Sequence, residues 1–370
     1  MEQKLKAVYN TSGKQKAKLA ARARFASFME MSEQKFGHLI IETEKDPLFK
    51  KFLFAGGRGA RLLKYSRFPG ASFSSSTIEF NDALACGGQP LDVEGFSEER
   101  AGAVASVRKI GLEKFRKYFL DSEEALEPAK LCSICGISEH ELALVIGLVN
   151  DIAVRGEFYH PSGLNQEAES NYFKIASVAY DSEGFPLISF YSPKYAQGRY
   201  IINRDTLEDL KRSGYFSEAE LPGIEALVNR LEKINLRKST IFQAVSNIAL
   251  RQKDYITSGN ECRLVEFTQK ALSAVIGVDS SIVSRAIYKK SVELPDGTEK
   301  PISFFFPSKQ DLCSFMIRDL IGGETSALSD DRIRKILAGR HNFVVSRRTV
   351  ALCRKESGID TYIVRRKARK

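Results

Sequence analysis

The stretch FTQKALSAVIGVDSSIVSRAI, residues 267–287, decides the fold in the second half of this 370-residue chain. It predicts one helix over about 268–275 and a second helix that begins near Asp279 or Ser280. Between them, Gly277 supplies the positive φ that such a turn often needs. This pattern is typical of a helix-turn-helix, whose second helix enters a groove of DNA. A helical hairpin that contacts no DNA is the alternative.

If the motif binds DNA, the residues at and after the start of its second helix would meet base edges and backbone. Their hydroxyl and cationic groups suit phosphate oxygens and base acceptors. The candidate DNA-binding residues of this unit are Ser280, Ser281, Ser284, Arg285 and Lys289.

A second stretch, SRRTVALCR at residues 346–354, predicts another DNA-contacting helix that continues to about Lys355. An arginine fork can bond guanine O6 and N7 bidentately, while hydroxyls and backbone N–H groups hold phosphates. Together with the capped helix that Ser329 would begin, this helix forms a second helix-turn-helix-like unit. The alternative is a solvated basic helix start. The candidate DNA-binding residues here are Ser346, Arg347, Arg348, Thr349 and Arg354.

The charge of the chain favours a polyanionic partner. A net charge of +10 and a pI near 9.2 suit nucleic acid or an acidic membrane surface. The basic residues concentrate at the C-terminus, where thirteen Lys and Arg from residue 332 onward accompany only Glu356 and Asp360. This asymmetry places the electrostatic footprint around the second candidate helix.

Other functional classes find little support. Cys132 and Cys135 form a CxxC, but no second pair stands at zinc-ligand spacing, which favours buried small side chains. Gly-Gly-Arg-Gly at 56–59 lacks the remaining residues of a phosphate loop. No nucleophile or acid–base pair stands out, so we expect no enzymatic activity, cofactor or metal. Scattered cysteines and the lack of a long apolar stretch predict a reduced, cytoplasmic protein without a membrane partner.

Both motifs resemble the bacterial sigma-54 family of transcription initiation factors. The C-terminal signature box of that family usually reads Ala-Arg-Arg-Thr-Val-Ala-Lys-Tyr-Arg, and here Leu352 and Cys353 replace its Lys and Tyr. The family's second helix reads His-Glu-Ser-Thr-Val-Ser-Arg, whereas this chain has Asp279, Ser280 and Ile282 in place of His, Glu and Thr. The preceding RKSTIFQAVSNIALRQKDYITSG, residues 237–259, is also similar to the family's sequence.

The N-terminal half resembles the family less closely. FMEMSEQKFGHLIIETEKDPLF, residues 28–49, is similar to the region through which the family contacts its activator. An amphipathic helical hairpin that packs on its own protein would give the same pattern. Residues 111–160 resemble the helical polymerase-binding region, and residues 171–205 alternate like a β-hairpin. The candidate activator-contacting residues are Phe28, Met31, Phe36, Leu39 and Ile40.

These observations predict a mainly α, multi-domain helical protein with a small β-hairpin element and two helix-turn-helix-like DNA-binding units. The resemblance implies five regions: a 1–54 N-terminal activator-contacting helical region, a 55–110 flexible linker, a 111–215 RNA polymerase core-binding domain, a 216–310 central DNA-binding domain with the helix-turn-helix, and a 311–370 C-terminal DNA-binding domain with the signature box.

The resemblance also implies a function. Such a factor binds core RNA polymerase, directs it to promoters with two separated elements, and forms open complexes only with an AAA+ enhancer-binding activator ATPase. The helix at 346–354 would read the guanine-rich upstream element, and the helix at 279–287 the downstream one. One alternative is a sequence-specific DNA-binding regulator of sigma-54 descent that no longer works with RNA polymerase. Another is a DNA-processing enzyme such as a recombinase, for which the sequence offers no convincing catalytic set.

Overall fold

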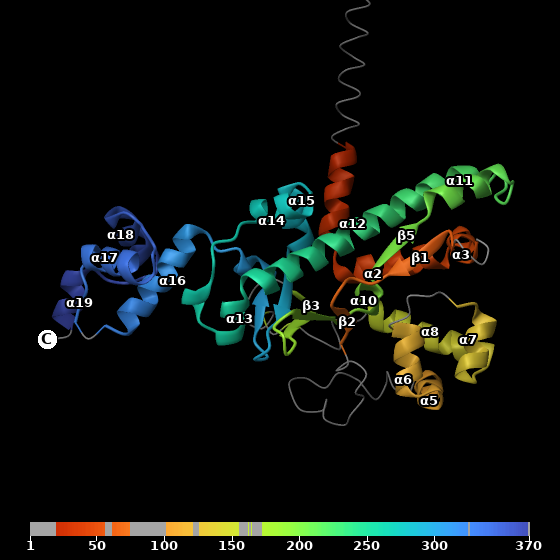
Figure 1. Cartoon of the computed structure of the whole chain (residues 1–370), viewed down its shortest axis with the longest axis horizontal. Helices are drawn as coiled ribbons and strands as arrows, with labels where there is room; N and C mark the ends of the chain where they lie inside the picture. Colours follow the sequence, from red (N-terminus) through yellow and green to blue (C-terminus); the bar gives the residue numbers. More distant parts are fainter. Residues whose placement is uncertain are drawn as a thin grey trace, which may run out of the picture.

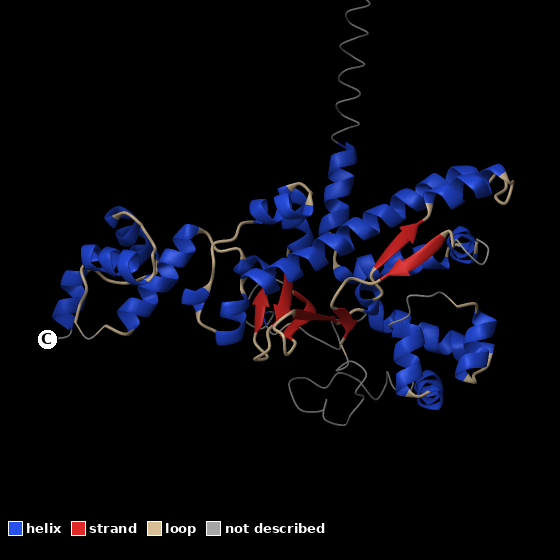
Figure 2. Cartoon of the chain, in the orientation of Figure 1, coloured by secondary structure: helices blue, strands red, loops and turns tan. Residues whose placement is uncertain are grey.

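The computed structural model describes residues 20–55, 61–74, 101–120, 126–154, 162, 164, 172–324 and 326–368. The described chain is mainly helical, as the sequence predicts, and its strands gather near the middle of the molecule (Figure 2). The molecule is elongated, with the C-terminal helices at one end of the long axis and the start of the longest helix toward the other (Figure 1).

The longest helix, α12 (Leu221–Arg251), spans 31 residues and forms the axis of the larger part of the molecule. Its apolar side chains recur at helical spacing and are buried, which explains why so long a helix is stable. These side chains include Ile224, Leu227, Leu231, Ile234, Ile241, Val245 and Ile248. Where the helix ends, the amide of Gln252 donates to the carbonyls of Val265 (2.8 Å) and Phe305 (3.1 Å).

Three helical segments precede the first strand: residues 20–30, α2 (Glu33–Lys45) and α3 (Pro47–Phe54). Side-chain oxygens of Ser32 and Asp46 cap α2 and α3 by accepting backbone N–H groups. Pro47 follows the end of α2 and occupies the first position of α3, where its missing N–H has no cost.

The next group of helices packs around α8. Gly136 in the left-handed conformation (φ 68°) ends α7, and Ser138 and Glu141 then exchange the two hydrogen bonds of a capping box. No single described helix could cross a membrane, and α7 with α8 meets the requirements of length and composition only as a pair bent by 98°. The elements are α5 (Ala101–Ile110), α6 (Leu112–Phe115), a π-helical turn (Arg116–Leu120), α7 (Pro128–Cys135) and α8 (Glu139–Val154).

The predicted β-hairpin is present as β3 (Phe173–Tyr180) and β4 (Pro186–Phe190). The structure adds what the sequence does not predict: the hairpin is the centre of a five-stranded sheet in the order β2-β4-β3-β6-β7. Strand β2 (Ala71–Phe73) runs parallel to β4, and β6 (Lys290–Glu293) runs parallel to β3. Strand β7 (Glu299–Pro301) closes the sheet antiparallel to β6.

A second sheet pairs β1 (Leu63–Ser66) with β5 (Arg199–Ile202). Strands β1 and β2 and helix α5 all lie within residues 55–110, where the sequence predicts a flexible linker. These segments are structured because their apolar side chains find burial: Leu62, Leu63 and Phe73 are at most 1% exposed. Residues 56–60 and 75–100 of that range lie outside the described part of the chain.

The remaining elements include the helices of the two candidate DNA-binding units. One large core joins residues from Met29 to Leu312, while a separate small core begins at Cys313 and includes Cys353. The boundaries of the five expected domains stay a prediction. The elements are α10 (Pro193–Ala196), α11 (Arg204–Arg212), α13 (Lys253–Ser258), two 3-10 turns (Glu261–Arg263 and Ile302–Phe305), α14 (Gln269–Ile276), α15 (Ser280–Ile287), α16 (Lys309–Gly322), α17 (Asp330–Arg340), α18 (Arg347–Glu356) and α19 (Tyr362–Ala368).

A buried cluster of charges ties the N-terminal segment to α12. The guanidinium of Arg237, 0% exposed, donates to the carbonyls of Phe28 (2.9 Å) and Met31 (2.6 Å) and to the carboxylate of Glu33 (2.6 Å). Lys290 lies 3.2 Å from the same carboxylate oxygen. Burial by itself raises the pKa of Glu33, but attraction to Arg237 and Lys290 outweighs it and lowers that pKa to about 2.

Replacing Glu33 with Ala should lower the free energy of unfolding by about 3–5 kcal/mol, because it leaves two buried cations without their counter-charge. Since the pKa of Glu33 falls from 4.5 to about 2 on folding, its contribution is fully present above about pH 4.5 and is lost toward pH 2. Urea unfolding at several pH values measures both effects. Glu42→Ala, at an exposed position of the same helix, is the control, and equal midpoints for the two variants would refute the prediction.

Candidate nucleic-acid interface

The first candidate unit, α14 and α15 with the turn between them, has the predicted helices and glycine turn. Thr268 caps α14 by accepting the N–H of Ala271 (3.0 Å), and Gly277 (φ 72°) ends it in the left-handed conformation. Asp279 then caps α15 by accepting the N–H of Ser281 at 2.8 Å. Helix α15 buries Val283, Ala286 and Ile287 and packs against α12. The large core thus holds this helix with its opposite side toward solvent.

The cap of α15 also sets the charge at its start. Hydrogen bonds from the hydroxyl and the N–H of Ser281 hold the pKa of the Asp279 carboxyl below its usual value. A carboxylate therefore occupies the N-terminal position where a phosphate could otherwise bind. The helix offers hydroxyls beyond that carboxylate rather than an anion site at its first turn.

Most candidate residues of this unit are available to a partner, since Ser280, Ser281, Ser284 and Lys289 are exposed. Arg285 is the exception, because its Nε donates to Glu30 at 3.0 Å. The two side chains are 36% and 49% exposed, and a surface pair of this kind contributes less than about 1 kcal/mol. A DNA phosphate could exchange with Glu30 at little cost.

The second candidate unit, α17 and α18, is built on the small core. Val350 and Cys353 of α18 pack with Ile333 and Leu337 of α17 and with residues of α16. Ser346 caps α18 by accepting the N–H of Thr349 at 3.0 Å, and the two hydroxyls lie 2.8 Å apart. Both hydroxyls therefore help to define the start of the helix.

Arg347 and Arg348 occupy the first two positions of α18 and are exposed. Neither guanidinium has an ion pair or side-chain hydrogen bond with any residue that the structure describes. A free guanidinium fork at a helix start can bond guanine O6 and N7 bidentately.

Arg354 does not belong with them, which corrects the sequence prediction. It is 7% exposed, its Nε donates to Asp330 at 2.8 Å, and its Nη1 donates to the carbonyl of Ile359 at 2.7 Å. Arg354 therefore joins the last turn of α18 to the start of α17. The sequence cannot distinguish such an arginine from an exposed one, because Asp330, its partner, lies 24 residues away in the chain.

The candidate activator-contacting residues are largely internal. Phe36 and Ile40 are at most 1% exposed, and Phe28, Met31 and Leu39 are partly buried against the same core. In this conformation Phe36 and Ile40 cannot contact another protein. The arrangement corresponds to the alternative left open by the sequence, a helical segment that packs on its own chain.

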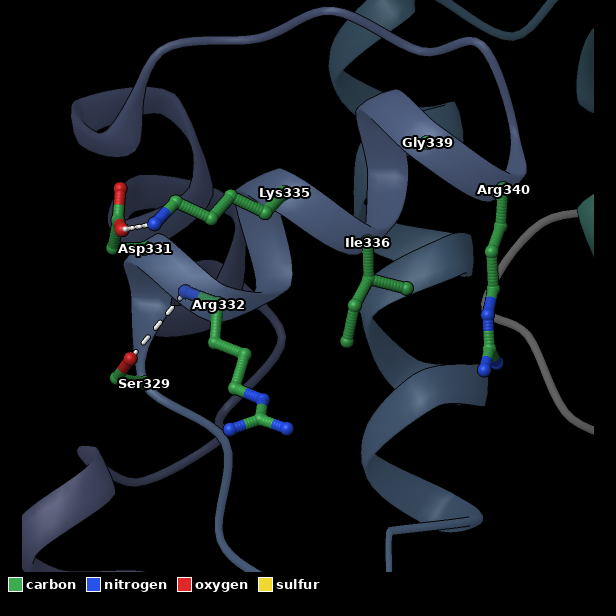
Figure 3. Close-up of a pocket in the computed structure, with 7 residues that line it drawn as sticks. All are labelled: Ser329, Asp331, Arg332, Lys335, Ile336, Gly339 and Arg340. Carbon is green, nitrogen blue, oxygen red and sulfur yellow. Dashed lines mark hydrogen bonds and ion pairs between the residues drawn. The ribbon is translucent and has the colours of Figure 1, made fainter.

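Sequence reasoning counted Arg332, Lys335 and Arg340 in the basic region without placing them. They lie along one side of α17 and, with Ile336 and Gly339, line a shallow hollow of about 540 Å³ (Figure 3). Their recurrence three to five residues apart, offset from the apolar positions of the same helix, is the signal that could have found them. Among the described residues, no cluster of three or more His, Cys, Asp or Glu could hold a metal.

A sequence profile of the sigma-54 DNA-binding domain matches residues 219–367, which include both candidate units. Residues 219–367 of this chain are thus similar to the sigma-54 DNA-binding domain. The RNA polymerase sigma-54 factor of Bacillus subtilis strain 168 is 29% identical over 143 residues, which are 35% of this chain and 32% of that protein. The putative RNA polymerase sigma-54 factor of Clostridium kluyveri is 31% identical over 171 residues, 43% of this chain and 36% of that protein.

The matches thus span about a third of the length of these curated relatives. A crystal structure of Aquifex aeolicus sigmaN bound to promoter DNA is 20% identical, with a TM-score of 0.35, and the match covers 88% of this chain and 99% of that one.

Replacing Arg354 with Met should destabilise the α16–α19 unit by roughly 2–3 kcal/mol. The loss is smaller than for a fully buried pair because the Asp330 side chain is 18% exposed. Thermal unfolding measures this effect, and Lys355→Met, at an exposed position, should leave it unchanged. Below the unfolding temperature the salt dependence of DNA binding should stay as in the unmodified chain; a shallower slope would instead assign Arg354 to the DNA contacts.

Proposed function

We propose that this chain is a sigma-54-type transcription initiation factor that binds core RNA polymerase and directs it to promoter DNA. The observation that carries the proposal is the start of α18, where Arg347 and Arg348 follow a capped Ser346 and project free guanidinium groups. The profile match over residues 219–367 supports a DNA-binding role for the surrounding domain. Catalysis of RNA synthesis would belong to the polymerase.

Each unit would read one promoter element. Helix α18 would read the upstream, guanine-rich element, because two arginine forks suit adjacent guanines. Helix α15 would read the downstream element with Ser280, Ser281, Ser284 and Arg285, and Lys289 would contact the backbone. Because Asp279 and Ser280 replace the family's His and Glu, we propose that the downstream base preference differs from the family's usual one.

The middle and N-terminal regions would supply the other partners. Residues 111–215 would contact core polymerase, and open-complex formation would depend on an AAA+ activator. With Phe36 and Ile40 in the core, an activator would have to act on the exposed side of the N-terminal helices or on a conformation in which they are released.

Changing Arg347 and Arg348 together to Ala should abolish sequence preference while leaving polymerase binding intact. Each bidentate contact contributes about 1–3 kcal/mol of discrimination, so the affinity for a preferred duplex should fall roughly 30-fold or more. Duplexes selected by the unmodified chain from a random pool, tested by fluorescence anisotropy, provide the measurement. Arg212→Ala with Arg230→Ala, two exposed arginines of α11 and α12, is the matched control. Unchanged preference in the α18 variant would contradict the proposal.

Association with polymerase separates the proposed factor from a DNA-binding regulator that has lost this partner. The full chain should co-purify with core RNA polymerase and should direct it to the selected duplexes. Open complexes, detected by reactivity of unpaired thymines, should form only with an activator ATPase and ATP. Binding to DNA without any association with core polymerase would favour the regulator instead.

A further inference from the structure

The arginines of α17 and α18, together with Arg365 of α19, fall into two groups. Those that shape the unit have carboxylate partners: Arg334 pairs with Asp331 (3.0 Å), Arg354 with Asp330 (2.8 Å), and Arg365 with Glu324 (2.5 Å). The others are exposed and, among the described residues, have no ion pair or side-chain hydrogen bond. These are Arg332 and Arg340 on α17 and Arg347 and Arg348 on α18.

Arg332 and Arg340 lie at the two ends of one exposed side of α17, with Lys335 between them (Figure 3). Eight residues of helix separate them by a rise of about 12 Å. One strand of DNA carries a phosphate about every 3.4 Å along the duplex axis, so this separation covers roughly three to four phosphates. Among the described residues that line the hollow, Asp331 is the acidic one, and it already pairs with Arg334 and Lys335.

Gly339 gives this side of the helix a flat surface. A Cβ added there would meet no atom of the chain within 4 Å, so packing within the protein does not require glycine. Gly339 is the last residue but one of α17, where glycine is still a weaker helix former than alanine, and a position without a side chain allows another backbone to approach closely. The glycine lies between Ile336 and Arg340, on the same side as the unpaired guanidinium groups.

We propose that this side of α17, formed by Arg332, Lys335, Gly339 and Arg340, binds the phosphate backbone of DNA beside the groove that α18 enters. The inference rests on the proposed function of α18, because residues 341–346 connect α17 directly to the start of that helix. A duplex in contact with Arg347 and Arg348 therefore passes close to the C-terminal end of α17. Arg332 and Arg340 hold the strand by charge, and Gly339 lets it approach the helix.

Counterion release makes this surface measurable. Changing Arg332 and Arg340 together to Ala should weaken binding to duplexes of every sequence alike, by about eightfold for each lost contact at about 0.1 M salt. The plot of log affinity against log salt should lose a slope of about 1.8. Arg332→Lys with Arg340→Lys keeps both charges and should restore most of the slope. In DNA affinity and in salt slope, the Arg212→Ala with Arg230→Ala chain should match the unmodified protein.

Gly339→Ala separates binding from folding, because the two roles predict opposite signs. Alanine should raise the melting temperature of the full chain's C-terminal transition by about 4 °C, since alanine favours the helix. The added methyl group should nevertheless weaken binding to duplexes of every sequence. If the variant melts at a higher temperature and its affinity for DNA is unchanged, DNA does not approach Gly339 closely. That result would overturn the proposed contact at Gly339.

The outcomes distinguish this inference from the proposed function. If the α18 variant loses sequence preference while Arg332→Ala with Arg340→Ala keeps the full salt slope, the inference fails and the proposed function stands. If the Arg332→Ala with Arg340→Ala variant loses affinity for core polymerase rather than for DNA, this side of α17 is a protein contact, and the inference is also overturned. If the α18 variant keeps its preference while the α17 variant loses slope, the chain binds DNA through α17 and the proposed role of α18 fails.

Discussion

The rest of the structure depends on one buried guanidinium. Arg237 lies inside the molecule at 0% exposure, and an isolated charge there would be prohibitively costly. Glu33 and two backbone carbonyls of the N-terminal segment make that position tolerable, and the ring of Phe36 lies 4.3 Å from the guanidinium carbon. Helix α12 can therefore bury its middle only when the N-terminal helices dock on it. Folding of the centre and placement of the N-terminus become a single event.

The two candidate DNA-binding helices, α15 and α18, pack on different hydrophobic cores. Helix α15 is part of the large core and rests against α12, whereas α18 packs on a small core of its own, connected through α16. The position of α15 depends on the docking of the N-terminal helices on α12. Arg285 of α15 also donates a hydrogen bond to Glu30 in the N-terminal segment. The position of α18 depends on local pairs such as Arg354 with Asp330. A change in how the N-terminal helices dock would therefore alter the position of α15, whereas α18 would keep its position on the small core.

Local features of this fold were predictable from the sequence, while distant ones were not. Thr268, Gly277 and Ser346 predict helix ends because caps and left-handed glycines act within four residues. Arg237 gave no such signal, since Glu33 lies 204 residues away in the chain. The same limit applies to strands β1 and β2, which pair with segments more than 100 residues later in the chain. It also explains why Arg354 was grouped with Arg347 and Arg348.

The parallel pairing of β3 with β6 has a consequence for synthesis. Strand β3 leaves the ribosome about 110 residues before β6, which corresponds to roughly ten seconds of translation. Throughout that interval one edge of the hairpin presents unpaired backbone N–H and C=O groups, which can pair with another nascent chain. Strand β6, which pairs with this edge, follows directly on α15 and therefore also holds the C-terminal end of that helix. The interval between the synthesis of β3 and that of β6 is therefore a stage at which the chain is open to aggregation.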